Sequence, residues 1–483
     1  MLRGKTMFVW GVLLLVFNHT VLAQNMTDSG KVYTLKQCVD SALKNNPTVR
    51  QVGFTAESAH INYEQQRANM LPSISASGNY GTNGGKSINN NTNSYVNTKN
   101  NSFYGQVSGS LTLFNGFAIQ NFIRQYALNY EADKMDWQQA KDQMTVNVIL
   151  AYLNVLSTKE QLNLAQQQME ATRRKVDLLD IQNREGAIAP SDFSDIKGQL
   201  ASDELTMIST KNALEAYKLA LAQFMNIPYS PVMQVESLGE DLTPVAYDMT
   251  VDQIYQNARN NLAQVKAASL HLASAEKAVK ATRGAMAPTL SFQGQANTAY
   301  SSIIALQGPL LSTTFDQTRN YVLVNGSQLP LYSPNDKFGD GPKVGFRDQF
   351  NNNVSTFYGL VLNVPILNGF RLRSQYKLAQ VTRDQADFNA KTTLITLRQS
   401  VESYYVTMMS DFRTYNVLAK QVQNYEESYH AAEIKYDAGA LKSVDYIIYK
   451  TNLDRARLNF VASKYNYILQ TKVLDYFQGR LTW

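Results

Sequence analysis

The chain has 483 residues, with 45 Lys and Arg against 39 Asp and Glu and a single Cys. One cysteine excludes an intramolecular disulfide and a cysteine metal cluster. The net charge of +6 is small for this length and no long block of basic residues occurs, so we expect no binding to nucleic acid.

The first 23 residues have the pattern of a secretory signal peptide. Arg3 and Lys5 precede an apolar run over 7–17, and the segment ends at the small residue Ala23. The apolar run is too short to favour a retained membrane anchor, and no later segment approaches the ~20 apolar residues of a spanning helix. The sequence therefore predicts an exported protein, with a signal peptide at 1–23 and no helical membrane span.

The rest of the chain contains two copies of one pattern. Five residues recur 216 positions later (250 − 34 = 216): Thr34, Ala42, Asn45, Pro72 and Ser75 match Thr250, Ala258, Asn261, Pro288 and Ser291. Three more recur 253 positions later (370 − 117 = 253): Phe117, Gly186 and Asp192 match Phe370, Gly439 and Asp445. The second copy therefore carries 37 extra residues (253 − 216 = 37). We expect a first repeat at 24–225, a linker at 226–249, a second repeat at 250–476 and a C-terminal tail at 477–483.

Each copy begins with a helical segment that a proline ends. The first copy is helix-like over about 34–70, and Pro72 cannot continue a helix. Alternation of small or apolar with polar residues then predicts strands at about 73–81 and 103–114. The Gly, Asn and Ser-rich stretch 81–102 between them is typical of a solvated loop.

The second copy predicts strands at about 289–300 and 355–366, with the insertion in the loop 301–354. Strands of about ten residues with one polar and one apolar face are typical of outer-membrane barrels, although a soluble sandwich has the same alternation. Four strands are too few to bury a core or close a barrel. Closure therefore requires several chains, since an open edge is excluded in lipid.

A long helix follows the second strand of each copy. Apolar residues from Val148 to Leu179, with Thr158 and Thr172 filling two gaps, are spaced alternately three and four apart, and the positions 253 later keep this period. A repeat of 3.5 residues indicates coiled-coil packing, and a continuous helix over 117–184 would be about 100 Å long. Glycine-containing turns at 184–190 and 436–442 end these helices and start returning ones. A dimeric coiled coil would explain the heptads, but neither the strands nor the duplication.

The order of these elements resembles the TolC-like outer membrane efflux protein family. The resemblance rests on the proline joins, the glycine-containing tips and the strand-to-helix junctions Asn115-Gly116 and Asn368-Gly369. It implies an α+β membrane protein whose tandem-duplicated protomer forms a homotrimer. Twelve strands would form one transmembrane β-barrel in the outer membrane, continued by a long periplasmic α-helical barrel. The tips would dock onto a periplasmic adaptor protein, which couples the channel to an inner-membrane pump.

The resemblance also implies roles for residues at the tips. The implied periplasmic gate consists of Asp192, Tyr436, Lys442 and Asp445. The implied adaptor contacts are Gly186, Ala187, Ile188, Gly439, Ala440 and Leu441. The chain departs from the family at four places: Gln182 and Asn183 replace a basic-aromatic pair, and Leu441 and Ile448 replace an arginine and an aspartate. The sequence therefore does not predict the family's full charge network at the gate.

No nucleotide-binding or nucleophile motif occurs, so we expect no enzyme activity and no cofactor. His430 and Glu433 could form a ligand pair on a helix, but no third ligand is evident and we expect no metal site. The sequence predicts a passive export duct of a tripartite efflux or type I secretion system. The alternative is a periplasmic adaptor or structural coiled-coil protein without channel activity. The exported substrate, whether drug, metal, small molecule or protein, stays open, as do the pump and adaptor.

Overall fold

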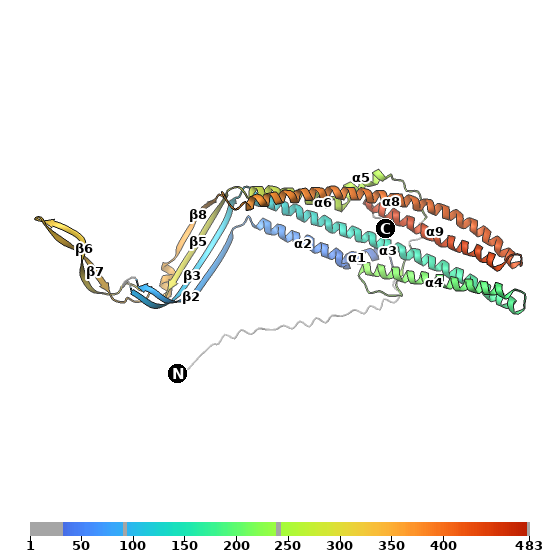
Figure 1. Cartoon of the computed structure of the whole chain (residues 1–483), viewed down its shortest axis with the longest axis horizontal. Coiled ribbons are helices and arrows are strands. Elements are labelled where there is room, and N and C mark those ends of the chain that lie inside the picture. Colours follow the sequence, from blue (N-terminus) through green and yellow to red (C-terminus); the bar gives the residue numbers. More distant parts are fainter. Residues whose placement is uncertain (1–31, 90–93, 238–242, 481–483) are drawn as a thin grey trace, which may run out of the picture.

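The protein is elongated, with strands at one end and helices at the other (Figure 1). The computed structural model describes residues 32–89, 94–237 and 243–480. The signal peptide expected at 1–23 lies outside these residues. Within the described chain, no helix has the length and apolar character needed to cross a membrane.

A four-stranded antiparallel sheet joins the two repeats. Its strands lie in the order β2-β3-β5-β8, and the pairing of β3 with β5 connects the copies. The strands are β2 (Ser73–Asn89), β3 (Ser94–Phe114), β5 (Thr289–Ser301) and β8 (Ser355–Asn363). In the described residues, β2 and β8 each have one edge without a partner strand.

The predicted strands differ from the observed ones at their ends. The stretch 81–102, expected as a solvated loop, belongs mostly to β2 and β3, which pair from Ser73 with Ser110 to Asn89 with Ser94. Pairing satisfies the backbone of these polar residues, and Thr82 Oγ1 also donates to Asn101 Oδ1 at 2.9 Å. β8 ends at Asn363, three residues earlier than expected, since Pro365 lacks the N–H that a ladder needs.

The insertion of the second repeat has secondary structure of its own. Strands β6 (Leu310–Val324) and β7 (Ser327–Phe338) form a hairpin that projects beyond the main sheet (Figure 1). Asn325 and Gly326, both with positive φ (51° and 82°), form its turn, as in two-residue hairpins of the Asn-Gly type. Helix α7 (Phe346–Asn352) follows and packs against β5. The segment 301–354 is therefore not a structureless loop.

Two helices of 67 residues dominate the other end of the molecule: α3 (Ala118–Arg184) and α8 (Arg371–Asp437). Near the sheet the helices lie in the order α2-α3-α6-α8, where α2 is Pro47–Ala68 and α6 is Ala263–Gly284. Towards the far end, α4 (Pro190–Met225) packs on α3 and α9 (Ser443–Phe477) packs on α8 (Figure 1). Each repeat thus contributes one long helical hairpin.

The single helix expected at 34–70 is in fact two helices, α1 (Leu35–Asn45) and α2. Asn46 between them is extended (ψ 125°), because the ring of Pro47 disfavours the helical conformation of the preceding residue. The Asn46 side chain then caps α2 by accepting from Thr48 N at 2.9 Å. The second repeat breaks at the equivalent place, between α5 (Val251–Asn261) and α6.

The linker at 226–249 contributes to the core. Its strand β4 (Gln234–Val235) pairs in parallel with β1 (Val32–Tyr33). Both strands lie over α3, where the fully buried Tyr152 points its hydroxyl at the carbonyls of Tyr33 (3.2 Å) and Glu236 (2.7 Å). The linker therefore fastens the start of the described chain to the middle of the helical body.

Candidate functional site at the helical tips

The two hairpin tips have the same backbone geometry. The first turn lies between α3 and α4 and the second between α8 and α9, both at the end far from the sheet (Figure 1). Gly186 (φ 69°) and Gly439 (φ 71°) occupy the left-handed position that ends each long helix. Ala187 N donates to Gln182 O and Ala440 N donates to Lys435 O, each at 2.8 Å. The duplication therefore extends to the hydrogen bonds of the tips.

The residues expected to contact an adaptor differ in exposure. Gly186, Ala187, Gly439 and Ala440 are exposed at the turns. Ile188 and Leu441 are half-buried and pack on an apolar cluster below the turns. The turns thus present small residues outward, while the larger side chains hold the hairpins together.

That apolar cluster, formed by Leu179, Ile196 and Tyr446 with their neighbours, joins the two hairpins. The rings of Tyr436 and Tyr446 stack with centroids 4.6 Å apart, and the hydroxyls of Tyr429 and Tyr446 are 2.9 Å apart. An aromatic pair of this kind contributes about 0.5–1.5 kcal/mol beyond the area it buries. Tyr429 and Tyr446 were not predicted as site residues, although the apolar spacing on α8 includes Tyr429.

Lys175 of the first hairpin binds the second hairpin at this cluster. Its ammonium forms an ion pair with Asp437 and lies 5.2 Å from the ring centroid of Tyr436. Burial raises the pKa of Tyr436 to about 12, with the charge of Asp192 as the next cause. The phenol is therefore neutral at physiological pH and can act as a hydrogen-bond donor.

Asp192, one of the expected gate residues, lies in the first turn of α4 and reaches the start of α9. The buried Ser443 Oγ is 2.8 Å from Asp192 Oδ1 and 2.8 Å from Asp195 Oδ2. A hydroxyl has one proton, so Ser443 donates to one of the two carboxylates at a time. This contact joins the two hairpins at the level of the tips.

The other two expected gate residues lie elsewhere. Lys442 and Asp445 are exposed, and neither makes a side-chain hydrogen bond or ion pair with the part of the chain that the structure describes. Asp445 lies in the first turn of α9, where the helix dipole favours an acid. The structure thus brings Asp192 and Tyr436 into the contact between hairpins, but not Lys442 or Asp445.

A second contact between the hairpins is a buried ionic network around Lys450, which sequence reasoning missed. Lys450 Nζ of α9 binds Asp203 of α4 at 2.9 Å and Asp454 at 2.5 Å. Asp203 also accepts from Thr172 Oγ1 at 2.5 Å and from Gln199 Nε2 at 2.7 Å. Burial alone would lower the pKa of Lys450, but the two carboxylates outweigh it and raise the pKa.

The position of Lys450 in the helix could have revealed this network. Tyr446, Lys450 and Leu453 are successive buried positions of α9, four and three residues apart. A lysine at an apolar heptad position must find a partner on the neighbouring helix, because an unpaired buried charge is very costly. That signal does not identify Asp203, which is 247 residues away.

The expected strand-to-helix junctions have an unusual backbone. Gly116 (φ 64°) and Gly369 (φ 60°) precede Phe117 (φ 61°) and Phe370 (φ 59°), so two consecutive residues are left-handed at each junction. Asn115 Oδ1 accepts from the first turn of α3, from Ile119 N at 3.3 Å. These corners redirect the chain from sheet to helix, and the two repeats share them.

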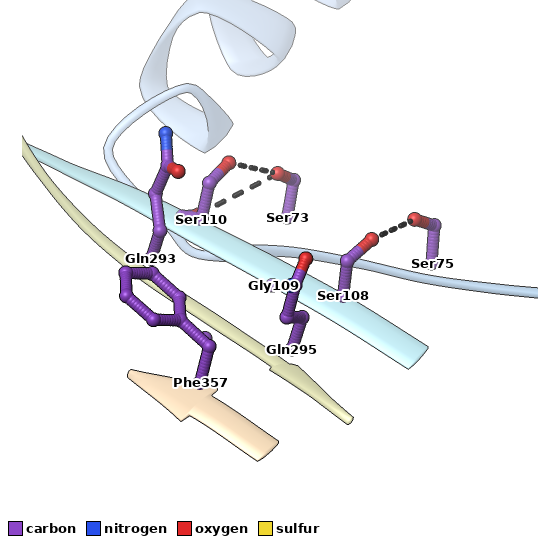
Figure 2. A pocket seen from close by; sticks show the side chains of 9 residues that line it. Ser73, Ser75, Ser108, Gly109, Ser110, Gln293, Gln295 and Phe357 are labelled. Atoms are coloured by element: carbon purple, nitrogen blue, oxygen red, sulfur yellow. Dashed lines mark hydrogen bonds between the residues drawn. The ribbon is translucent and has the colours of Figure 1, made fainter. Parts of the chain in front are cut away.

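One face of the four-stranded sheet, next to these corners, is polar. Ser73 and Ser110 hydroxyls lie 2.9 Å apart, and those of Ser75 and Ser108 lie 3.1 Å apart (Figure 2). Gln293 and Gln295 of β5 line the same recess, with Phe357 of β8 as its one large apolar side chain. The opposite face is apolar, and in the single chain its side chains are exposed. They are Ile74, Val107, Phe292, Leu360 and Leu362.

Comparison with known proteins agrees with this architecture. The family model described as outer membrane efflux protein matches residues 38–226 and 254–475. Outer membrane protein TolC of Escherichia coli (strain K12) is 22% identical over 441 residues, which are 90% of this chain and 80% of TolC.

Solved structures show the same fold. The Campylobacter jejuni CmeC outer membrane channel aligns with a TM-score of 0.71 at 18% identity, covering 92% of this chain and 85% of CmeC. The outer membrane protein VceC of Vibrio cholerae aligns with a TM-score of 0.72 at 13% identity, covering 92% of this chain and 96% of VceC. The family match spans both repeats, and the resemblance seen in the sequence is confirmed: the chain belongs to the outer membrane efflux protein family.

Proposed function

We propose that this chain is the outer-membrane channel subunit of a tripartite efflux or type I secretion system, and that three copies close into one export duct. The observation that carries this proposal is the matching order of β2-β3-β5-β8 in the sheet and α2-α3-α6-α8 in the helices. The sheet ends at β2 and β8, and the row of helices ends at the matching elements α2 and α8. A neighbouring copy that pairs with one edge of the sheet can therefore also pack against the helix on the same side.

Closure by other copies follows from the edges of the sheet. In lipid, each unpaired backbone group of β2 or β8 would cost several kcal/mol. Pairing β8 of one copy with β2 of the next removes both edges, and three copies supply the twelve strands of the family's barrel. The helices at the same edges, α2 and α8, would then meet across the same boundary.

The two faces of the sheet support this orientation. Ile74, Phe292 and Leu360 would face lipid, where their exposed apolar surface is stable. The serine and glutamine face of Figure 2 would line the lumen, where hydroxyl and amide groups stay hydrated. A soluble sandwich would instead bury the apolar face, which the described chain leaves open.

The tips would form the periplasmic gate and the docking site for the adaptor. The contact of Ser443 with Asp192 and Asp195 and the ion pair of Lys175 with Asp437 hold the second hairpin against the first. Pulling the second hairpin away would open the entrance. Lys442 and Asp445, exposed beside the turn, would act on neighbouring copies or on solutes, and the small exposed turn residues would contact the adaptor.

This mechanism is passive, because the pump supplies the energy and the chain supplies the path. The alternative, an adaptor or structural coiled coil without channel activity, is not favoured, since the family match covers both repeats. The four-stranded sheet with an exposed apolar face also has no role in that alternative.

Single-channel recording in planar bilayers tests the proposal. Asp192→Ala/Asp195→Ala removes both acceptors of Ser443, so we expect long closures in the wild type and a clear rise in open probability in this variant. Asp177→Ala is the matched control, since this exposed carboxylate of α3 makes no hydrogen bond or ion pair with another described side chain. Equal conductance in all three proteins would place the gate elsewhere. Silent bilayers with inserted trimers would exclude the export duct.

A further inference from the structure

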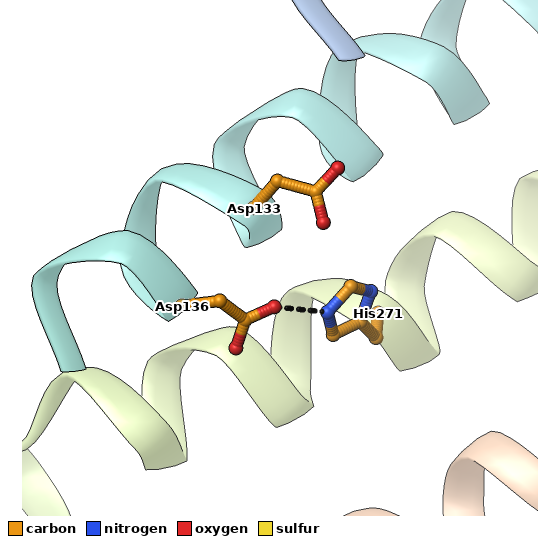
Figure 3. Close-up of side chains that lie close together, drawn as sticks. All are labelled: Asp133, Asp136 and His271. Atoms are coloured by element: carbon orange, nitrogen blue, oxygen red, sulfur yellow. Dashed lines mark hydrogen bonds and ion pairs between the residues drawn. The ribbon is translucent and has the colours of Figure 1, made fainter. Parts of the chain in front are cut away.

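Three potential metal ligands from the two repeats meet between α3 and α6. Asp133 and Asp136 lie one turn apart on α3, and His271 faces them from α6 (Figure 3). One ligand atom of each residue lies within 4.8 Å of the other two. His271 Nε2 is 2.8 Å from Asp136 Oδ2. The group lies about 23 Å along α3 from its start at Ala118, far from the tips.

The three groups are accessible and chemically mixed. The His271 and Asp136 side chains are 39% and 38% exposed, so an ion can reach them from solvent. Asp133 Oδ2 accepts from Asn129 Nδ2 at 3.1 Å, which leaves its other oxygen without a donor among the described residues. Imidazole nitrogen with carboxylate oxygen is a donor set that Zn²⁺ and related divalent ions accept.

The charges around the group favour a cation. Asp133 and Asp136 lie one turn apart on α3, and each places a carboxylate oxygen within 4.8 Å of a ring nitrogen of His271. The lysines next to them on α3 are engaged elsewhere. Lys134 pairs with Glu131 at 2.9 Å, and Lys141 lies 4.4 Å from the ring centroid of Trp137. Two carboxylates thus share one imidazole, and an added divalent ion would balance them.

We propose that Asp133, Asp136 and His271 bind one divalent transition-metal ion, with Zn²⁺ as the reference case. Ligand atoms in a tetrahedral zinc site are about 3.3 Å apart. Rotation of half-exposed aspartate side chains can bring donors that now lie within 4.8 Å to that spacing. The ion would connect the first repeat to the second through α3 and α6, with water in the remaining position.

The pair His430 and Glu433, considered from the sequence, provides the contrast. The structure gives Glu433 a different partner, the Tyr429 hydroxyl at 3.3 Å, and assembles no group of three ligands there. The three residues of the proposed site could not be combined from sequence, because 135 positions separate Asp136 from His271. Their meeting depends on the packing of the two repeats.

Calorimetric titration of the untagged, detergent-solubilised full chain with Zn²⁺ tests the proposal. We expect one ion per chain in the wild type, at least a tenfold loss of affinity in His271→Ala, and wild-type affinity in His430→Ala. Co²⁺ titration followed by visible absorption supplies a second readout, because coordinated imidazole and carboxylate change the spectrum of the ion.

Asp133→Asn guards against a folding defect in the histidine variant, since it keeps the size of the side chain and one oxygen that can accept from Asn129 Nδ2. It should lose affinity like His271→Ala while circular dichroism and trimer migration stay at wild-type values. The proposal is wrong if the wild type does not bind one Zn²⁺ per chain, or if His271→Ala and His430→Ala bind Zn²⁺ with the same affinity. In either case the group is only a His-Asp ion pair. Neither outcome depends on channel activity.

Discussion

Individual residues account for much of the attachment between the two hairpins, and Lys450 is the clearest case. Its side chain is 6% exposed, and its ammonium lies between Asp203 and Asp454. A buried ion pair does not by itself make a protein more stable, but removal of one partner leaves charge unpaired in a buried site. The network therefore fixes how the hairpins sit on each other more than it adds net stability.

Lys450→Met should destabilise the protein by about 3–5 kcal/mol near neutral pH, because both carboxylates lose their cation. Thermal unfolding followed by circular dichroism measures the effect. Arg173→Met is the control, since Arg173 of α3 binds Glu204 of α4, the residue next to Asp203, at 2.8 Å but is 55% exposed. A surface pair contributes about 0–1 kcal/mol, so a similar loss in both variants would contradict the assigned role.

Tyr436 should make stability fall at alkaline pH. Its pKa rises to about 12 in the folded chain, whereas an unfolded tyrosine ionises near its ordinary pKa of 10. The contribution is complete below pH 10 and is lost as the pH rises towards 12, because the unfolded chain releases its proton first. Tyr436→Phe should therefore show a shallower decline of unfolding temperature between pH 10 and 12. A decline as steep as that of the wild type would count against this environment.

Elements show where sequence reasoning succeeds. The duplication, the long helices and the glycine turns all follow from local periodicity and spacing, which neighbouring chains do not change. The stretch 81–102 was misjudged because Asn, Gly and Ser favour loops, and only pairing across the hairpin makes them strands. The break at Asn46 was overlooked although Pro47 follows it directly. At the candidate site, the family resemblance predicts Asp192 and Tyr436 as gate residues, whereas Ser443 and Lys450 depend on contacts between repeats.

The junctions between sheet and helix allow a comparison of the two repeats. A Cβ on Gly116 would overlap the carbonyl oxygen of Gly284, while Gly369 has no atom within 4 Å of that position. Gly369→Ala should cost about 1–2 kcal/mol for its left-handed backbone alone. Gly116→Ala should cost more, and thermal unfolding of both variants measures the difference. Equal costs would mean that the first corner can move away from α6.

At the scale of the whole molecule, the projecting hairpin of β6 and β7 is separate from the main sheet. Replacing residues 310–338 by a short Gly-Ser link should leave trimer formation and conductance unchanged. Gel migration with and without heating, followed by bilayer recording, measures both. Loss of trimers would show that the hairpin takes part in assembly.

Helix α7 supplies the matched control for that deletion. Gln349 is 2% exposed and binds both Ser301 N and Ser301 O at 2.9 Å, so it ties the insertion to the end of β5. Gln349→Leu should lower trimer yield, because it leaves two backbone groups at the end of β5 without their partner. The insertion thus has an anchored base and an independent tip.

The equal length of α3 and α8, 67 residues each, has a consequence for the entrance of the duct. Both helices start at equivalent corners, so the two turns of one chain end about 100 Å from the sheet at the same height. Three chains would bring six ends into one level rim, alternating in sequence but matched in backbone. A partner that binds at this rim would meet six nearly equivalent binding positions, although a channel of three chains would have only threefold symmetry.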